Sequence, residues 1–159
     1  MYDLGNVYDA EHQFLEAMRT MEKQSSSDNV KSLLQQHIRQ TEQQIQNLEQ
    51  VYQTMGQQPK RVKCEGADGL VSEAQKVMKE TSGNPALMDA AMAGAWARVE
   101  HYEIASYRGL IDGARTMGNN QAVRLLEENL NQEEQTAQKV EQNVPQLLKQ
   151  AMSAGQRGA

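Results

Sequence analysis

Apolar residues recur at three- and four-residue intervals along most of this chain, which is the period of an amphipathic α-helix. Four long segments show the pattern, at about 3–23, 29–55, 86–117 and 119–142. In the first segment the positions are Leu4, Val7, Tyr8, Leu15, Met18 and Met21. Because aromatic and β-branched residues are scarce, the composition favours helices over sheets, and the pattern predicts an all-α protein built on four long helices.

Polar turn residues and glycines separate these helices. The serines at 25–27 and the following Asp28 can form a turn. Ser27 or Asp28 can then cap the second helix. Gly56 and Gly118 follow the second and third helices, where glycine commonly ends a helix. Short turns join antiparallel neighbours, so we expect two helical hairpins, at 1–55 and 86–142.

A longer connection, 56–85, joins the two hairpins. It contains Pro59 and a short amphipathic helix at about 69–80. The second helix is about 40 Å long at roughly 1.5 Å per residue, and a connection of this length can return along it. The second and third long helices would then run in the same direction, as in a ferritin-like four-helix bundle with one long crossover.

Residues 1–159 are expected to form one such domain. Pro145 is predicted to open a separate short helix at 144–153, and the glycine-containing tail after Ser153 is predicted to fray.

Composition narrows the classes of protein that this chain can be. The formal charge is −5 and the isoelectric point is near 5.2, which argues against a broad basic face for nucleic acid. The single cysteine, Cys64, excludes an internal disulfide framework and suits a reducing compartment. No apolar run reaches the length of a membrane span, and no signal-peptide segment is recognisable. We therefore expect a soluble, cytoplasmic protein.

Two carboxylates stand inside the Ala-rich third helix. Glu100 and Glu103 are three residues apart and share one helical face. Two like charges on an inner face repel each other and resist loss of water, and a bound cation would relieve both effects. Carboxylates from several helices of a bundle commonly supply such a metal centre.

Each of the other long helices offers one residue to the same centre. Glu11 lies on the apolar stripe of the first helix, His37 on that of the second, and Glu133 one turn beyond Leu130 on the fourth. With Glu100 and Glu103 they would bind one or two ions of iron or manganese, since carboxylates bridge divalent cations and imidazole adds a softer ligand.

Each residue also has a simpler interpretation. An inward glutamate such as Glu11 is often paired with a basic side chain, and a single inward histidine such as His37 is often an ordinary core residue. Glu133 lies in a Glu-rich stretch that could be a solvated face. The nine methionines are interpreted as core filler, and Cys64 as non-catalytic. The argument for a metal centre is the coincidence of such residues on all four helices.

Several motifs resemble those of the ferritin-like YciE/YciF stress-protein family of bacteria. They are Asp9-Ala10-Glu11, His37-Ile38-Arg39-Gln40-Thr41, Glu100-His101-Tyr102-Glu103-Ile104-Ala105 and Leu130-Asn131-Gln132-Glu133-Glu134. The resemblance covers essentially the whole chain. It implies a homodimeric four-helix bundle with a rubrerythrin-like site layout and a link to stress. In the metal-centre hypothesis, His101 would lie beside the site.

The chain departs from that family at two positions. Gln40 stands where the family usually has glutamate, and Ala137 stands where an acidic residue often lies one turn past Glu133. Two hypotheses follow. In one, the protein is a metal protein whose ions react with oxygen or peroxide, with any enzymatic role left open. In the other, it holds no metal and is a helical dimer that binds a protein partner during stress.

Overall fold

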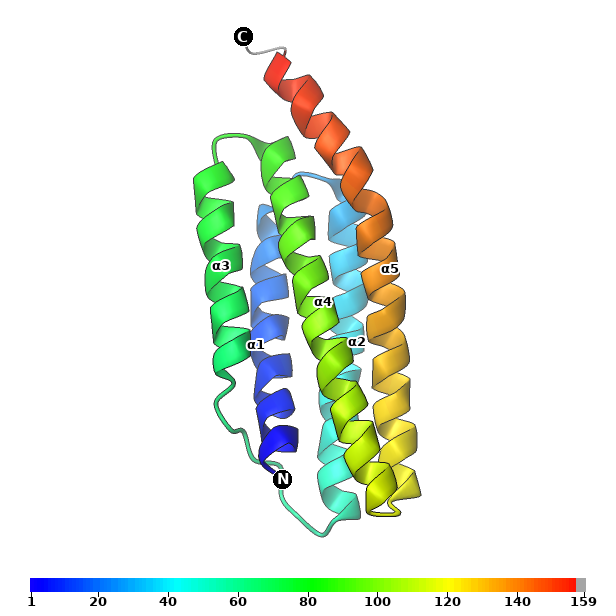
Figure 1. Cartoon of the computed structure of the whole chain (residues 1–159). Coiled ribbons are helices and arrows are strands. Elements are labelled where there is room, and N and C mark those ends of the chain that lie inside the picture. The colour runs from blue at the N-terminus through cyan, green and yellow to red at the C-terminus, as the bar shows by residue number, and fades with distance from the viewer. Residues whose placement is uncertain (157–159) are drawn as a thin grey trace.

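The computed structural model describes residues 1–156, and this part of the chain forms helices and no strand. The helices are α1 (Tyr2–Gln24), α2 (Asp28–Thr54), α3 (Glu65–Thr81), α4 (Pro85–Thr116) and α5 (Asn120–Gln156). Four of them, α1, α2, α4 and α5, form a bundle, and α3 packs outside it against α1 and α4 (Figure 1). The all-α prediction is confirmed.

The order of the helices around the bundle follows from the two hairpins. The helices of each hairpin, α1 with α2 and α4 with α5, pack antiparallel, and α2 also contacts α5 while α1 contacts α4 (Figure 1). The crossover and α3 bring the chain back to the end where α2 began, so α2 and α4 run in the same direction. This is the predicted bundle with one long crossover.

The helices begin and end at residues suited to those positions. The Ser27 side chain accepts a hydrogen bond from the Val30 N–H at the start of α2, and Asn84 does the same for Leu87 in α4. Gly56 and Gly118 have φ angles of 66° and 70°, in the left-handed region that glycine enters most easily.

The crossover is fixed to α1 before α3 begins. The Val62 N–H donates to the Gly5 carbonyl at 2.9 Å. Asp9 accepts hydrogen bonds from the Cys64 N–H and from Arg61. Cys64 is buried and caps α3, which therefore starts at Glu65 rather than near residue 69.

The prediction of a separate helix at 144–153 is wrong. Helix α5 continues without a break from Asn120 through Pro145 to Gln156. Proline removes one backbone donor, but Leu147 and Ala151 beyond it are buried and hold the following turns in place. The predicted frayed tail is helical as far as Gln156, and residues 157–159 lie outside the described part.

Apolar side chains form two large clusters, one toward each end of the bundle. One includes Leu4, Leu48, Tyr107 and Leu126, and the other includes Met18, Leu34, Trp96 and Val140. Buried polar residues lie between the two clusters: on α4, Glu100 and Glu103 fall between Trp96 of the second cluster and Tyr107 of the first. Within residues 1–156, none of the helices combines the length and apolarity needed to cross a membrane.

Candidate metal centre

All five residues predicted from the sequence are buried, each on the helix expected for it. His37 on α2, Glu100 and Glu103 on α4, and Glu133 on α5 each offer a ligand atom, and these atoms all lie within 4.8 Å of one another. Glu11 on α1 is fully buried beside this group, and its charge contributes to raising the pKa of Glu103. Every helix of the bundle therefore contributes to one polar cluster.

His37 presents one ring nitrogen to the carboxyl groups. Its Nε2 lies 3.1 Å from Glu100 Oε1 and 3.7 Å from Glu133 Oε2. Its Nδ1 lies 3.2 Å from the Thr136 hydroxyl and 3.4 Å from Gln40 Oε1. Partners on the Nδ1 side fix the orientation of the ring, as they do for histidines that bind metals through the other nitrogen.

Three of the carboxyl groups are held through one oxygen only. Tyr107 donates a hydrogen bond to Glu11 Oε1, Trp96 donates to Glu100 Oε1, and Gln44 donates to Glu133 Oε1. The second oxygen, Oε2, of each glutamate is buried without a hydrogen-bond partner. Buried polar atoms are usually satisfied, and these oxygens can be satisfied by a proton shared with a neighbouring carboxyl group or by a bound cation.

The carboxyl groups hold protons more tightly than glutamates in water. Burial, together with the charge of Glu133, raises the pKa of Glu11 to about 8. Burial also raises the pKa of Glu100 to about 7, and it raises those of Glu103 and Glu133 well above the ordinary value. Loss of water disfavours the charged form of all four groups, and repulsion between carboxylates adds to it, although a hydrogen bond with Glu133 lowers the pKa of Glu100 in part.

A second layer of buried polar residues supports the cluster on one side. Asn47 donates to Asn129 at 2.7 Å, and Asn129 donates to the Tyr107 hydroxyl at 3.0 Å. Tyr107 in turn bonds to Glu11. This chain of hydrogen bonds joins α1, α2, α4 and α5 and fixes the position of the Glu11 carboxyl group.

The sequence interpretation missed these supporting residues, although their spacing could have revealed them. Gln44 lies seven residues after His37, Tyr107 lies four after Glu103, and Asn129 lies four before Glu133. These intervals keep a residue on the same helical face. Their side chains are uncharged, so the sequence alone did not indicate that they contact the glutamates.

One detail of the predicted site is wrong. His101 does not lie beside it, because a residue next to Glu100 in the helix points about 100° away. Its side chain is exposed and lies 2.7 Å from Glu141 Oε1. On α5 the Thr136 hydroxyl contacts His37, and the neighbouring Ala137 is also buried.

The contacts also bear on the simpler interpretations, in which these glutamates pair with basic side chains or lie on a solvated face. None of the ion pairs within residues 1–156 joins a lysine or arginine to Glu11, Glu100, Glu103 or Glu133. Arg108 instead pairs with the exposed Glu134 at 2.7 Å. Glu133 is fully buried, so its stretch of α5 is not simply a solvated face.

The donor set fits a hard or borderline divalent cation. It consists of carboxylate oxygens and one imidazole nitrogen, which suit manganese and iron. Soft ligands are absent from it, since Cys64 lies apart with its Sγ 3.0 Å from the Tyr102 hydroxyl. The unpartnered oxygens and the raised pKa values are consistent with a site built around positive charge.

Comparisons with known proteins agree with the resemblance found in the sequence. Residues 1–153 match the family described as "Domain of unknown function (DUF892)". Protein YciF of Escherichia coli (strain K12) is 35% identical over 134 residues, which cover 84% of this chain and 80% of that protein.

Solved structures show the same relationship. The E. coli stress protein YciF superposes with a TM-score of 0.87 at 32% identity, covering 93% of both chains. YcfI of Rhodopseudomonas palustris gives 0.85 at 36% identity, covering 88% of both. Protein XCC3681 of Xanthomonas campestris pv. campestris shares the fold, with a TM-score of 0.78 at 21% identity over 97% of this chain and 93% of that one. The chain therefore belongs to the DUF892 family and is a relative of the stress protein YciF.

Proposed function

We propose that this protein is a stress-associated, ferritin-like metal protein that binds iron or manganese among Glu11, His37, Glu100, Glu103 and Glu133. The observation that carries the proposal is the set of buried, unpartnered oxygens on Glu11, Glu100 and Glu133. The link to stress rests on its similarity to a relative that is called a stress protein.

The charges of the cluster favour two ions over one. Four ionised carboxylates carry four negative charges, which two divalent cations would neutralise. His37, Glu100, Glu103 and Glu133 already lie close enough together to share one ion. Glu11 would supply a carboxylate for the second, with its other oxygen held by Tyr107.

Bound in the reduced state, such ions would supply electrons to oxygen or peroxide. The residues of this chain orient and enclose the centre. Thr136 and Gln40 hold the Nδ1 side of His37, which leaves Nε2 directed at the carboxylates. The apolar clusters on either side limit the entry of water.

Titration of the metal-free protein under anaerobic conditions tests the proposal. Fe(II) or Mn(II) is added to the full chain, and binding is followed by calorimetry and elemental analysis. We expect about two ions per chain, as in other bundles with carboxylate centres. Oxygen or peroxide is then added to the iron-loaded protein, and absorbance reports whether the iron is oxidised.

Glu133→Gln and Glu134→Gln form a matched pair for this titration. The two residues are neighbours, but Glu133 is buried in the cluster and Glu134 is exposed and paired with Arg108. Glu133→Gln should lose most of the bound metal, and Glu134→Gln should bind like the unaltered chain. Equal binding by all three proteins, or no binding by any, would contradict the proposal.

The second candidate is a metal-free protein that binds partners during stress. Gln40, Gln44 and Thr136 favour it, since they place neutral side chains around the cluster. The R. palustris relative is also provisionally described as a structural protein. Absence of metal binding in the titration would favour this candidate.

A further inference from the structure

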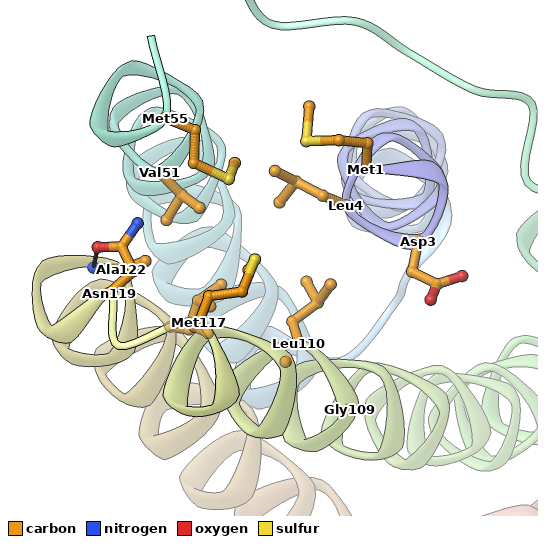
Figure 2. Close-up of a pocket in the computed structure, with 13 residues that line it drawn as sticks. Met1, Asp3, Leu4, Val51, Met55, Gly109, Leu110, Met117, Asn119 and Ala122 are labelled. Atoms are coloured by element: carbon orange, nitrogen blue, oxygen red, sulfur yellow. Dashed lines mark hydrogen bonds between the residues drawn. The ribbon is translucent and has the colours of Figure 1, made fainter. Parts of the chain in front are cut away.

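A cavity lies at the end of the bundle where α1 begins and α2 ends, away from the acidic cluster. Its volume is about 240 Å³, and all four helices of the bundle line it (Figure 2). The lining includes Leu4, Val51, Leu110, Ala114, Ala122 and Leu126. The cavity is open to solvent on the side where the exposed Met1 and Met117 lie, and none of its lining residues belongs to the candidate metal centre.

Asp3 and Asn119 are the polar side chains among the residues that line this cavity. Asn119 donates from Nδ2 to the Thr54 hydroxyl at 2.7 Å and accepts from the Ala122 N–H at 3.0 Å. The Asp3 carboxylate points away from the cavity (Figure 2). Apolar side chains make up most of the lining, so burial of apolar surface is the main interaction that the cavity offers to a ligand.

The helices leave this space open although larger side chains would fit. A Cβ atom added at Gly109 or Gly113 of α4 would meet no atom within 4 Å. Both glycines are exposed and line the open side of the cavity, so a larger side chain could be placed at either position without a clash.

Flexible side chains surround the opening. Met1, Met55 and Met117 point into it from three helix ends (Figure 2). Met1 and Met117 are more than half exposed, at 64% and 67%. Unbranched thioether side chains adjust to the shape of an apolar guest, and they can admit one without moving the backbone.

We propose that this cavity binds a small, neutral, apolar molecule about the size of naphthalene. An engineered apolar cavity of about 150 Å³ in another protein binds benzene, so the present cavity has room for a larger hydrocarbon. A helix from a partner is about 10–12 Å across with its side chains and does not fit such a space. The proposal is independent of metal binding.

Methionine methyl groups provide reporters on both sides of the molecule. The full chain, labelled with ¹³C at these methyls, is titrated with naphthalene and followed by NMR. Met55 and Met117 should shift in a saturable manner, whereas Met18 and Met92, buried in the other apolar cluster, should not.

Two substitutions fill the cavity from different helices, Ala122→Leu and Gly113→Leu. Each should weaken naphthalene binding at least tenfold. Ala105→Leu, at an exposed position of α4, is the matched control and should leave binding unchanged. Because Gly113 borders open space, its variant keeps the test available if Ala122→Leu fails to fold.

Three outcomes would overturn the proposal. One is the absence of saturable shifts, and another is binding that survives both cavity-filling substitutions. The third is a change at Met55 and Met117 that depends on protein concentration without naphthalene, which would show that a second copy of the chain covers the opening.

Discussion

His37 Nε2 lies 3.1 Å from Glu100 Oε1, inside a cluster of four buried glutamates. A single imidazole cannot balance four carboxylates. Without a bound cation the folded protein therefore keeps protons on some of these groups, which the raised pKa values of Glu11 and Glu100 reflect. Stability and metal binding should consequently depend on pH in opposite directions.

The metal-free protein should lose stability as the pH rises from 5 to 8. The pKa of Glu11 is about 8 and that of Glu100 about 7 when folded, against roughly 4.3 for glutamate in an unfolded chain. The stabilising contribution is complete below the unfolded value and disappears as the pH passes the folded values. Urea unfolding in the presence of a chelator, at pH 5, 6.5 and 8, measures it.

Added Mn(II) should reverse this trend, since ions bind the deprotonated carboxylates of the folded state. The loaded protein should be more stable at pH 8 than at pH 5. Asp9 titrates differently, because hydrogen bonds from Cys64, Gln13 and Arg61 outweigh its burial and lower its pKa. The stability that ionised Asp9 contributes is lost below about pH 4, outside the range tested. A metal-free protein that becomes steadily more stable up to pH 8 would contradict the prediction.

Glu133→Gln should stabilise the metal-free protein at pH 8. The substitution keeps the size of the side chain and an oxygen for the Gln44 hydrogen bond, while it removes a buried carboxyl group whose ionisation the fold disfavours. A gain of about 1–2 kcal/mol would raise the melting temperature by several degrees for a domain of this size. Glu134→Gln, which breaks only an exposed pair with Arg108, should change stability by less than about 1 kcal/mol.

Tyr107→Phe should weaken both the fold and the metal centre. It removes the donor to Glu11 and one partner of Asn129, at a cost of about 1–3 kcal/mol. The Tyr107 hydrogen bond also lowers the pKa of Glu11, so its loss should move the midpoint of metal binding to higher pH.

Tyr52→Phe is the control for this substitution. Its hydroxyl donates to the Lys60 carbonyl in the crossover, and it is also fully buried. Tyr52→Phe should lower the stability of the fold without changing the pH midpoint of metal binding. The same midpoint in both variants would show that Tyr107 does not act on Glu11.

Gly5→Ala and Gly94→Ala should have opposite effects on stability. A Cβ at Gly5 would lie 2.6 Å from Val62 Cγ2 and 2.9 Å from the Lys60 carbonyl oxygen, so the crossover would have to move. At Gly94, inside α4, an added Cβ meets nothing within 4 Å. We expect a loss of about 1–3 kcal/mol at residue 5 and a gain of up to about 1 kcal/mol at residue 94, measured by thermal unfolding.

The bundle and the clustering of the five polar residues could be predicted because both depend on helical periodicity. Glu11, His37 and Glu133 stood on apolar stripes, and burial of those stripes brings them together whatever the details of packing. The separate helix after Pro145 was a wrong prediction, because a local rule about proline ignored the burial of Leu147 and Ala151.

The supporting polar residues could not be identified in the same way. A buried Asn129 or Gln44 is stable only with a partner on another helix, and the sequence does not say which residue that is. The cavity near Gly113 and Ala122 is also a property of several helices at once. Contacts between elements, rather than patterns within them, decide these features.

The candidate centre draws residues from both hairpins, which the chain itself joins only through the crossover and α3. Ions bound there would hold the N-terminal and C-terminal hairpins together. Opening of the bundle, and with it access for proteases, would then require release of the metal. The lifetime of the protein in the cell would in this way follow the supply of the ion, and its abundance would report on metal availability.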